Sequence, residues 1–281
     1  MSMTINTNVQ SLNAQRNAGV SQSSLSTSLQ RLSSGLRVNS AKDDAAGLAI
    51  AERMNSQVRG MNVAIRNAND GISLAQTADG GLASMADMVQ RMRELTVQSV
   101  NATNTSGDIV ALNEEYTQLS NELGRTLSAV QFNGTSLFTN TGNFDFQVGA
   151  NSGQTIQVSS AALNIHTAAS LSAIKSGGAA SALISSAASA NAANITALDA
   201  ALTTINSSRA TLGAVQSRFE TTISFLRTAV ENQSAARGRI MDADFAAETS
   251  NLSRAQILQQ AGTAMIAQAN QLPQGVLALL R

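Results

Sequence analysis

The sequence predicts a mainly α-helical protein: an elongated antiparallel helical bundle or coiled coil with a small β-hairpin region, its N- and C-termini paired. Apolar residues recur at alternating steps of three and four through long stretches at both ends of the chain, which is the spacing of a coiled-coil seam. Near the middle the spacing changes to strict alternation, which is typical of strands. A chain that goes out as helices, turns at a small β element and returns as helices brings its ends together.

The N-terminal part of the 281-residue chain carries three helical stretches. The apolar stripe covers residues 5–36, continues over 51–75 and resumes over 82–95. Gly80 and Gly81 lie between the last two stretches, and we expect them to interrupt the helix there.

A break and a further helix follow. The polar run 101–108 predicts a loop, with Asp108 as the N-cap of a helix over residues 109–130. The dipeptide Asn133-Gly134 is a strong turn signal, so this helix is expected to end just before it.

The middle of the chain has a different character. Residues 144–148 and 155–158 alternate apolar and polar side chains around the turn-forming run 149–153, which predicts a β-hairpin at about 140–160. The stretch at about 160–194 is rich in Ala and Ser and has few large residues. Within it, we interpret residues 176–194 as a flexible connection or a weak helix.

The returning part of the chain is again helical. The three-and-four spacing covers residues 195–230 and then 258–279, and Gly238 weakens the pattern between them. Pro273 has no backbone N–H, so it is expected to kink the last helix without necessarily ending it.

The composition excludes several classes of function. The chain has one His and no Cys, which excludes a disulfide framework, a thiolate metal site and a multi-histidine centre. With 18 basic and 18 acidic residues and 3% aromatics, neither bulk positive charge nor a base-stacking platform is available for nucleic acid. No run of 18 apolar residues exists to span a membrane. We therefore predict no catalytic residue, no cofactor, no metal, and neither nucleic acid nor membrane as a partner.

Each end of the chain is too poor in apolar residues to fold alone. In residues 1–42, about eight apolar anchors at roughly 2 kcal/mol each give about 16 kcal/mol at full burial. Ordering this segment costs roughly 1 kcal/mol or more per residue. Pairing with residues 255–281 leaves a two-helix coil with open apolar sides, so neighbouring copies of the chain are expected to complete it. The residues expected to carry this self-assembly are Ile5, Val9, Leu12, Leu25, Leu29, Leu32, Leu36, Leu258, Met265, Leu272, Val276 and Leu279.

Long motifs at both ends of the chain resemble one family. They are INTNVQSLNAQRN, LQRLSSGLRVNSAKDDAAGLAIAERM and, at the C-terminus, ILQQAGTAMIAQANQLPQGVLALLR, supported by FQVGAN and RIMDADFAAETSNLSRAQ. Together they resemble bacterial flagellin over about residues 1–160 and 190–281. The stretch left between them is short, so we infer that the large outer domains of many flagellins are absent.

The resemblance implies a structural subunit of the bacterial flagellar filament, secreted unfolded through the type III flagellar apparatus to the extracellular filament. Residues 1–43 and 239–281 would form its inner core, and residues 44–238 its outer core. Implied partners are copies of the chain, the export apparatus, a chaperone that binds the C-terminus, the filament cap and the hook-junction proteins. The alternative is a hook–filament junction protein, whose ends usually match flagellin less well. An enzyme is rejected because residues 160–194 hold no His-Glu pair and no metal-ligand spacing.

The resemblance also implies recognition by the vertebrate Toll-like receptor for flagellin. By chemistry alone, the segment around residue 91 is a solvated helix face with apolar residues turned to the core. Matching the family's segment places seven residues at the receptor contact: Gln90, Arg91, Glu94, Leu95, Glu115, Leu198 and Leu202. The same helices are expected to contact neighbouring subunits, so the receptor should bind the monomer and not the filament.

One residue departs from the family pattern. Flagellins usually have Asn where this chain has Phe225, within a helix expected near the subunit interface. A change of about 1–2 kcal/mol shifts an equilibrium between two packings about tenfold. Phe225 is therefore expected to bias filament supercoiling toward one state.

Overall fold

The computed structural model describes residues 7–175 and 188–278. The chain divides into two compact units, one formed by residues 57–230 and one formed by its two ends, up to residue 56 and from residue 231. Both units are mainly helical, and the two end segments of the chain belong to the same unit. The predicted fold class, mainly α with paired termini and a small β region, is confirmed.

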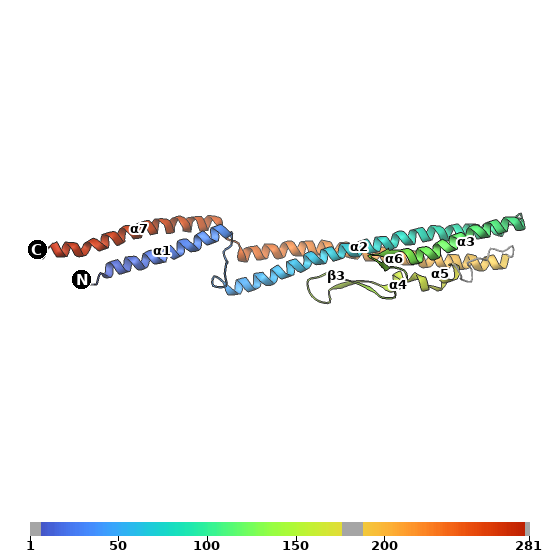
Figure 1. The fold of residues 1–281 in the computed structure, drawn as a ribbon, viewed down its shortest axis with the longest axis horizontal. Coiled ribbons are helices and arrows are strands. Elements are labelled where there is room, and N and C mark those ends of the chain that lie inside the picture. The colour runs from blue at the N-terminus through green and yellow to red at the C-terminus, as the bar shows by residue number, and fades with distance from the viewer. Residues whose placement is uncertain (1–6, 176–187, 279–281) are drawn as a thin grey trace. The chain divides into compact units, whose positions relative to one another are not determined.

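In the unit formed by the chain ends, the first and last helices lie side by side (Figure 1). These are α1, Val9–Ser34, and α7, Phe245–Ala278. Helix α1 starts at the N-cap Asn8, whose side chain accepts a hydrogen bond from the Ser11 N–H, and it ends at Gly35 in the left-handed conformation with φ of 71°. Helix α7 continues through Pro273, so the proline does not end it.

The two chain breaks beside these helices are tied together. Leu36 and Asp242 form an antiparallel bridge, the Arg37 N–H donates to the Met241 carbonyl over 2.6 Å, and the Ala243 N–H donates to that of Gly35 over 2.9 Å. Beside them Val38, Ala51 and Met241 form a small buried cluster.

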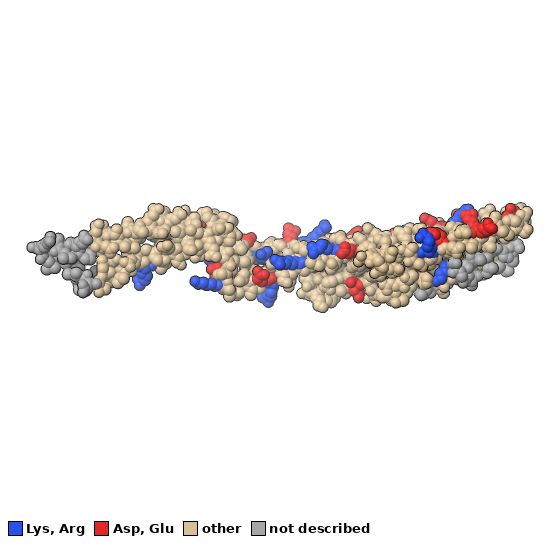
Figure 2. Space-filling view, viewed as in Figure 1, with Lys and Arg blue, Asp and Glu red and all other residues tan. Residues whose placement is uncertain are grey.

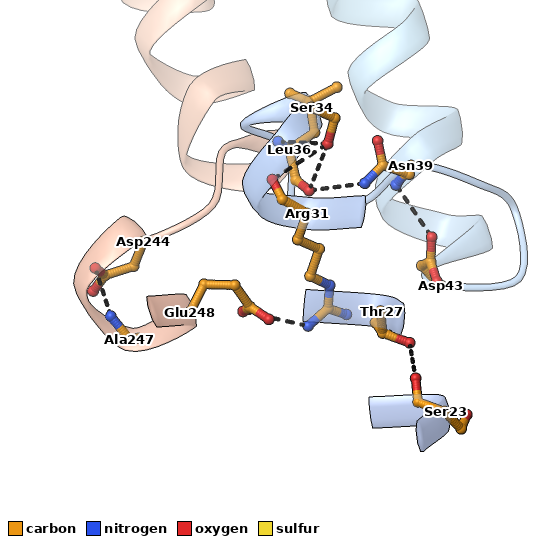
Figure 3. A network of polar contacts seen from close by, with 10 residues as sticks. All are labelled: Ser23, Thr27, Arg31, Ser34, Leu36, Asn39, Asp43, Asp244, Ala247 and Glu248. Atoms are coloured by element: carbon orange, nitrogen blue, oxygen red, sulfur yellow. Dashed lines mark hydrogen bonds and ion pairs between the residues drawn. The ribbon is translucent and has the colours of Figure 1, made fainter. Parts of the chain in front are cut away.

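The second helix, α2, Ala45–Ser99, begins directly after two acidic residues, Asp43 and Asp44. The Asp44 carboxylate accepts a hydrogen bond from the Gly47 N–H over 2.7 Å, as a helix cap does. Asp43 closes the preceding loop (Figure 3), where hydrogen bonds from the side chain and backbone of Ser40, and then from the Asn39 backbone, lower the pKa of Asp43.

The unit of residues 57–230 is built on the antiparallel helices α2 and α6, Ala188–Met241. Ion pairs join Asp79 to Arg209 over 2.8 Å and Arg93 to Asp199 over 2.7 Å, so residue numbers rise along α2 as they fall along α6. Helix α3, Ser106–Ala129, returns from the end of α2 and packs on the same core.

The glycines within the long helices do not interrupt them. Helix α2 runs unbroken through Gly80 and Gly81, so the predicted interruption was wrong: each glycine costs about 1 kcal/mol in a helix, which packing outweighs. A Cβ at Gly81 would lie 3.1 Å from Phe138, so that glycine lets the loop after α3 approach. Helix α6 likewise continues past Gly238.

The N-cap of α3 is Thr105 and not Asp108, which is a correction of the sequence-based assignment. Thr105 accepts a hydrogen bond from the Asp108 N–H, and the Asp108 carboxylate accepts one from the Thr105 N–H, so the two form a capping box. Hydrogen bonds from the side chain and then the backbone of Thr105 lower the pKa of Asp108.

Two hairpins follow α3. Strands β1, Gln131–Phe132, and β2, Thr135–Ser136, are joined by Asn133 and Gly134, both with positive φ, which suits a tight hairpin turn. The predicted larger hairpin is confirmed as β3, Phe144–Gln147, paired antiparallel with β4, Thr155–Val158.

Short helical turns cover the stretch after β4. They are α4, Ser160–Leu163, the 3-10 turn η1, Ile165–Thr167, and α5, Ala169–Ile174. The Ser120 hydroxyl of α3 donates to the Ile174 carbonyl over 2.8 Å and fixes α5 against α3. Of the expected flexible connection or weak helix at 176–194, residues 176–187 lie outside the described residues, and the rest belong to α6.

The core of this unit is a continuous apolar cluster between the helices and the larger hairpin. Phe146 of β3 meets Phe219 of α6 edge to face, with ring centroids 5.6 Å apart. Gly71 of α2 makes room for the second ring, because a Cβ there would lie 2.6 Å from the Phe219 Cζ. Tyr116 is fully buried, and that burial raises the pKa of its phenol to about 12.

The Phe219 contact generates a stability prediction. Gly71→Ala is expected to destabilise the protein by about 1–3 kcal/mol, because the added methyl overlaps a ring that packing holds in place. Gly80→Ala in the same helix meets nothing within 4 Å and is the matched control, expected to stabilise by about 0.5–1 kcal/mol. Urea unfolding followed by circular dichroism at 222 nm measures both, and equal effects of the two variants would contradict the assigned contact.

Candidate assembly and recognition surfaces

The contact between α1 and α7 is made by small and polar side chains. The buried residues on these two helices are Ser11, Ser28, Glu248, Ala255 and Ala269. Hydrogen bonds fix their register, with the Asn8 amide donating to the Ala269 carbonyl and the Ser11 hydroxyl to the Asn270 side chain, each over 2.8 Å. Leu25 and Leu32 of α1 and Leu252 and Ile266 of α7 are half-buried.

The large apolar side chains of the same helices face outward. Val9 is 63% exposed and Met265 is 62% exposed. Figure 2 shows few charged side chains over α1 and α7 on the face in view. Such a surface is unusual for a protein that stays monomeric. The exposed large apolar residues of this surface are Val9, Leu12, Val20, Leu29, Phe245, Ile257, Leu258 and Met265.

The structure places the expected assembly residues in three groups. Val9, Leu12, Leu29, Leu258 and Met265 are exposed, and Leu25, Leu32 and Leu36 are half-buried. Ile5 and Leu279 lie outside the described residues, and so do the side chains of Leu272 and Val276 on α7. Sequence reasoning missed Val20, Phe245 and Ile257, although Val20 continues the step of four from Leu12 across Arg16.

A second surface lies where α2 faces α3. Arg91 donates from Nε to the Glu115 carboxylate over 2.8 Å and from Nη1 to that of Glu94 over 3.0 Å. The hydrogen bond to Glu115 and then that to Glu94 raise the pKa of Arg91. All three side chains are about half exposed or more, so the two ion pairs contribute little to stability. Their effect is to hold the guanidinium in one orientation on a rigid helix.

The structure separates the other residues of this expected site by depth. Gln90 is exposed beside Arg91, and Leu202 is half-buried on α6. Leu95 and Leu198 are fully buried, so they belong to the core beneath the surface and support its backbone. The ion pair of Arg93 with Asp199 was missed, because no local signal links residues so far apart in the sequence.

Phe225 lies on α6 with 69% of its surface exposed, more than any other large apolar side chain in the described part of the chain. It makes no contribution to the core of its unit, whose neighbouring anchors on α6 are Ile223 and Leu226.

The described residues give little support for metal binding, membrane insertion or a catalytic triad. Within residues 7–175 and 188–278, no three His, Cys, Asp or Glu side chains gather as metal ligands. In the same ranges no helix combines the length and hydropathy needed to cross a bilayer. His166 lies on η1 with its Nε2 3.3 Å from the Lys175 ammonium, and no triad forms around it.

Comparison with known proteins decides the family. The bacterial flagellin N-terminal helical region matches residues 5–143, and the bacterial flagellin C-terminal helical region matches residues 195–280. The flagellin of Halalkalibacterium halodurans is 46% identical over 99% of this chain and 100% of its own. The chain belongs to the bacterial flagellin family. It is therefore a structural, non-enzymatic protein that polymerises into the extracellular flagellar filament.

Two further proteins are similar to the chain over different extents. The flagellar filament 33 kDa core protein of Treponema phagedenis is 42% identical over 99% of this chain and 100% of its own. A crystal structure of Bacillus cereus flagellin has 27% sequence identity and a TM-score of 0.49, covering 61% of this chain and 94% of that one.

Proposed function

We propose that this flagellin assembles through the outward apolar surface of its α1–α7 pair. The observation that carries the proposal is that large apolar side chains are exposed on both helices, while the fully buried residues described there are small or polar. Burying one large apolar side chain contributes about 1.5–3 kcal/mol. Contacts with neighbouring copies therefore provide the core that the pair lacks.

The proposal assigns residues 1–43 and 239–281 to an inner core of the filament and residues 44–238 to an outer core. Two chain breaks support this division, one after Gly35 and one between α6 and α7. Helix α1 ends at the first break and helix α7 begins at the second. The two helices can therefore pack among neighbouring copies as one element.

Export and assembly partners complete the proposal. The chain leaves unfolded through the type III flagellar apparatus, with a chaperone on its C-terminal segment, and joins the filament between the hook-junction proteins and the cap. The absence of Cys supports this route, because a disulfide would keep a segment from passing as a single extended strand.

The assembly surface generates the next prediction. Leu258→Gln is expected to lower filament yield strongly while the exported monomer keeps its helical content, since Leu258 is exposed and buries little in the monomer. Filaments are quantified by sedimentation and electron microscopy, with monomer measured in the culture medium. Gln268→Ala, at an exposed polar position of the same helix, is the control. Wild-type filament yield from Leu258→Gln would contradict the proposal.

We further propose that the exposed residues around Arg91 form the contact with the vertebrate Toll-like receptor for flagellin. Two carboxylates hold the Arg91 guanidinium, and Gln90 lies beside it on the same helix. A pre-oriented arginine on a rigid helix is a favourable anchor for a partner, because little side-chain entropy remains to be lost on binding.

The receptor proposal predicts that Arg91→Ala reduces receptor signalling by monomer at least about tenfold, as expected when a central arginine anchor is removed. Stability should change little, because both ion pairs are exposed. Arg125→Ala removes a comparable exposed pair with Glu122 on α3 and is expected to leave signalling unchanged. A reporter-cell assay on folded monomer measures receptor signalling by the two variants. Equal signalling from both variants would count against the proposed receptor contact at Arg91.

Phe225 is proposed to bias filament supercoiling. Its exposed ring adds apolar surface to α6, so one of two subunit packings gains contacts that Asn would not supply. Filaments of Phe225→Asn are expected to differ from wild type in waveform by electron microscopy. Identical waveforms would remove this assignment.

A further inference from the structure

The methionines are the side chains of this flagellin that peroxides oxidise most readily. The chain has nine methionines, no Cys and no Trp, and its one Tyr, Tyr116, is fully buried. Cysteine thiolates, which commonly react first, are therefore missing, and the methionine thioethers are left as the targets. How readily each methionine reacts depends on how exposed its sulfur is.

Exposure separates one methionine from the others in the described part of the chain. Met265 of α7 is 62% exposed. Met54 and Met88 on α2 are half-buried, and Met1 and Met3 lie outside the described residues. Four more lie in the apolar clusters of their units with at most 7% exposed: Met61, Met85, Met92 and Met241. An oxidant in solution therefore reaches the sulfur of Met265 ahead of the other described methionines.

Met265 lies on the apolar surface proposed for assembly. It follows Leu258 by seven residues, which places both side chains on one face of α7, and Leu258 is 50% exposed. The sequence from residue 255 to residue 278 contains no acidic or basic residue. A neighbouring copy that covers this face therefore buries the Met265 thioether in an uncharged surface.

We infer that Met265 is an oxidation site and that its sulfoxide blocks entry of a monomer into the filament. The inference rests on the proposed assembly through α1 and α7. Hydrogen peroxide supplies the oxygen: its O–O bond breaks as an S–O bond forms at the Met265 sulfur. The sulfur is oxidised by two electrons, and the second oxygen of the peroxide leaves with both hydrogens as water. The sulfoxide is polar, so burying it against a neighbouring copy carries a desolvation cost that the thioether does not have.

Oxidation at this position leaves the monomer folded. Met265 belongs to none of the buried apolar clusters of the described residues, so its sulfoxide stays in water before assembly. The contact between α1 and α7 is kept, including the hydrogen bond from the Asn8 amide to the Ala269 carbonyl. Methionine sulfoxide reductases convert the sulfoxide back to the thioether. The block therefore acts at assembly and is reversible.

Peroxide treatment of the full-length monomer tests the site itself. Monomer is treated with hydrogen peroxide, the peroxide is removed, and the sulfoxide at each methionine is measured by peptide mass spectrometry. Met265 is expected to react at least about tenfold faster than the four methionines of the apolar clusters. Circular dichroism checks that the treated monomer keeps its helical content. Equal oxidation rates at Met265 and at those four residues would overturn the assigned site.

The effect on assembly is measured as the critical concentration for polymerisation. Wild-type monomer oxidised at Met265 is expected to show at least about a tenfold increase, because an apolar side chain no longer contributes its burial. Met265→Leu is the matched control: it keeps an apolar side chain that peroxide does not oxidise, so treatment should leave its critical concentration unchanged. Met265→Gln, which is polar without oxidation, is expected to reproduce the increase in untreated monomer.

Reduction of the treated wild type with methionine sulfoxide reductases is expected to restore polymerisation, which separates sulfoxide formation from irreversible damage. Three results would overturn the inference: an unchanged critical concentration of wild type that carries Met265 sulfoxide, an equal increase in treated Met265→Leu, or a loss that the reductases do not reverse. Each of these leaves the proposed function standing if Leu258→Gln still lowers filament yield. Wild-type filament yield from Leu258→Gln would instead contradict the proposed function, regardless of the result at Met265.

Discussion

The fully buried side chains described on α1 and α7 are small or polar, and much of the behaviour of this flagellin follows from that constraint. Serine and alanine let the two helices approach, and hydrogen bonds from Asn8 and Ser11 set their register. The energy that would stabilise an ordinary helix pair remains on the outside, on residues such as Val9 and Met265. The register of the helix pair is therefore set within one chain, and contacts with neighbouring copies would stabilise the pair.

The unit of residues 57–230 has the opposite arrangement. Its large apolar side chains meet in one core, with Phe146 and Phe219 in edge-to-face contact and Gly71 leaving space for the ring. Ion pairs between α2 and α6 lie at its surface and determine alignment more than stability. This unit does not depend on assembly for its core, which explains why exposed groups such as Arg91 are held in a defined geometry.

Periodicity predicted the helices and the larger hairpin, because both are dictated by which face of an element is apolar. It failed at Gly80 and Gly81, where tertiary contacts with Phe138 outweigh local propensity, and at Asp108, where the cap is shared with Thr105. The family match assigned residues to the receptor site without separating exposed from buried ones. It included Leu95, although the apolar spacing alone turns this residue to the core, where the structure buries it beside the exposed Glu94.

The pairing of α1 with α7 also joins segments that lie far apart in the sequence, as the hydrogen bond from the Asn8 amide to the Ala269 carbonyl shows. A chain cut short before Phe245 therefore has an α1 with no α7 beside it. Such a fragment lacks half of each surface that another copy would contact. Only a chain that extends through both helices can form the pair.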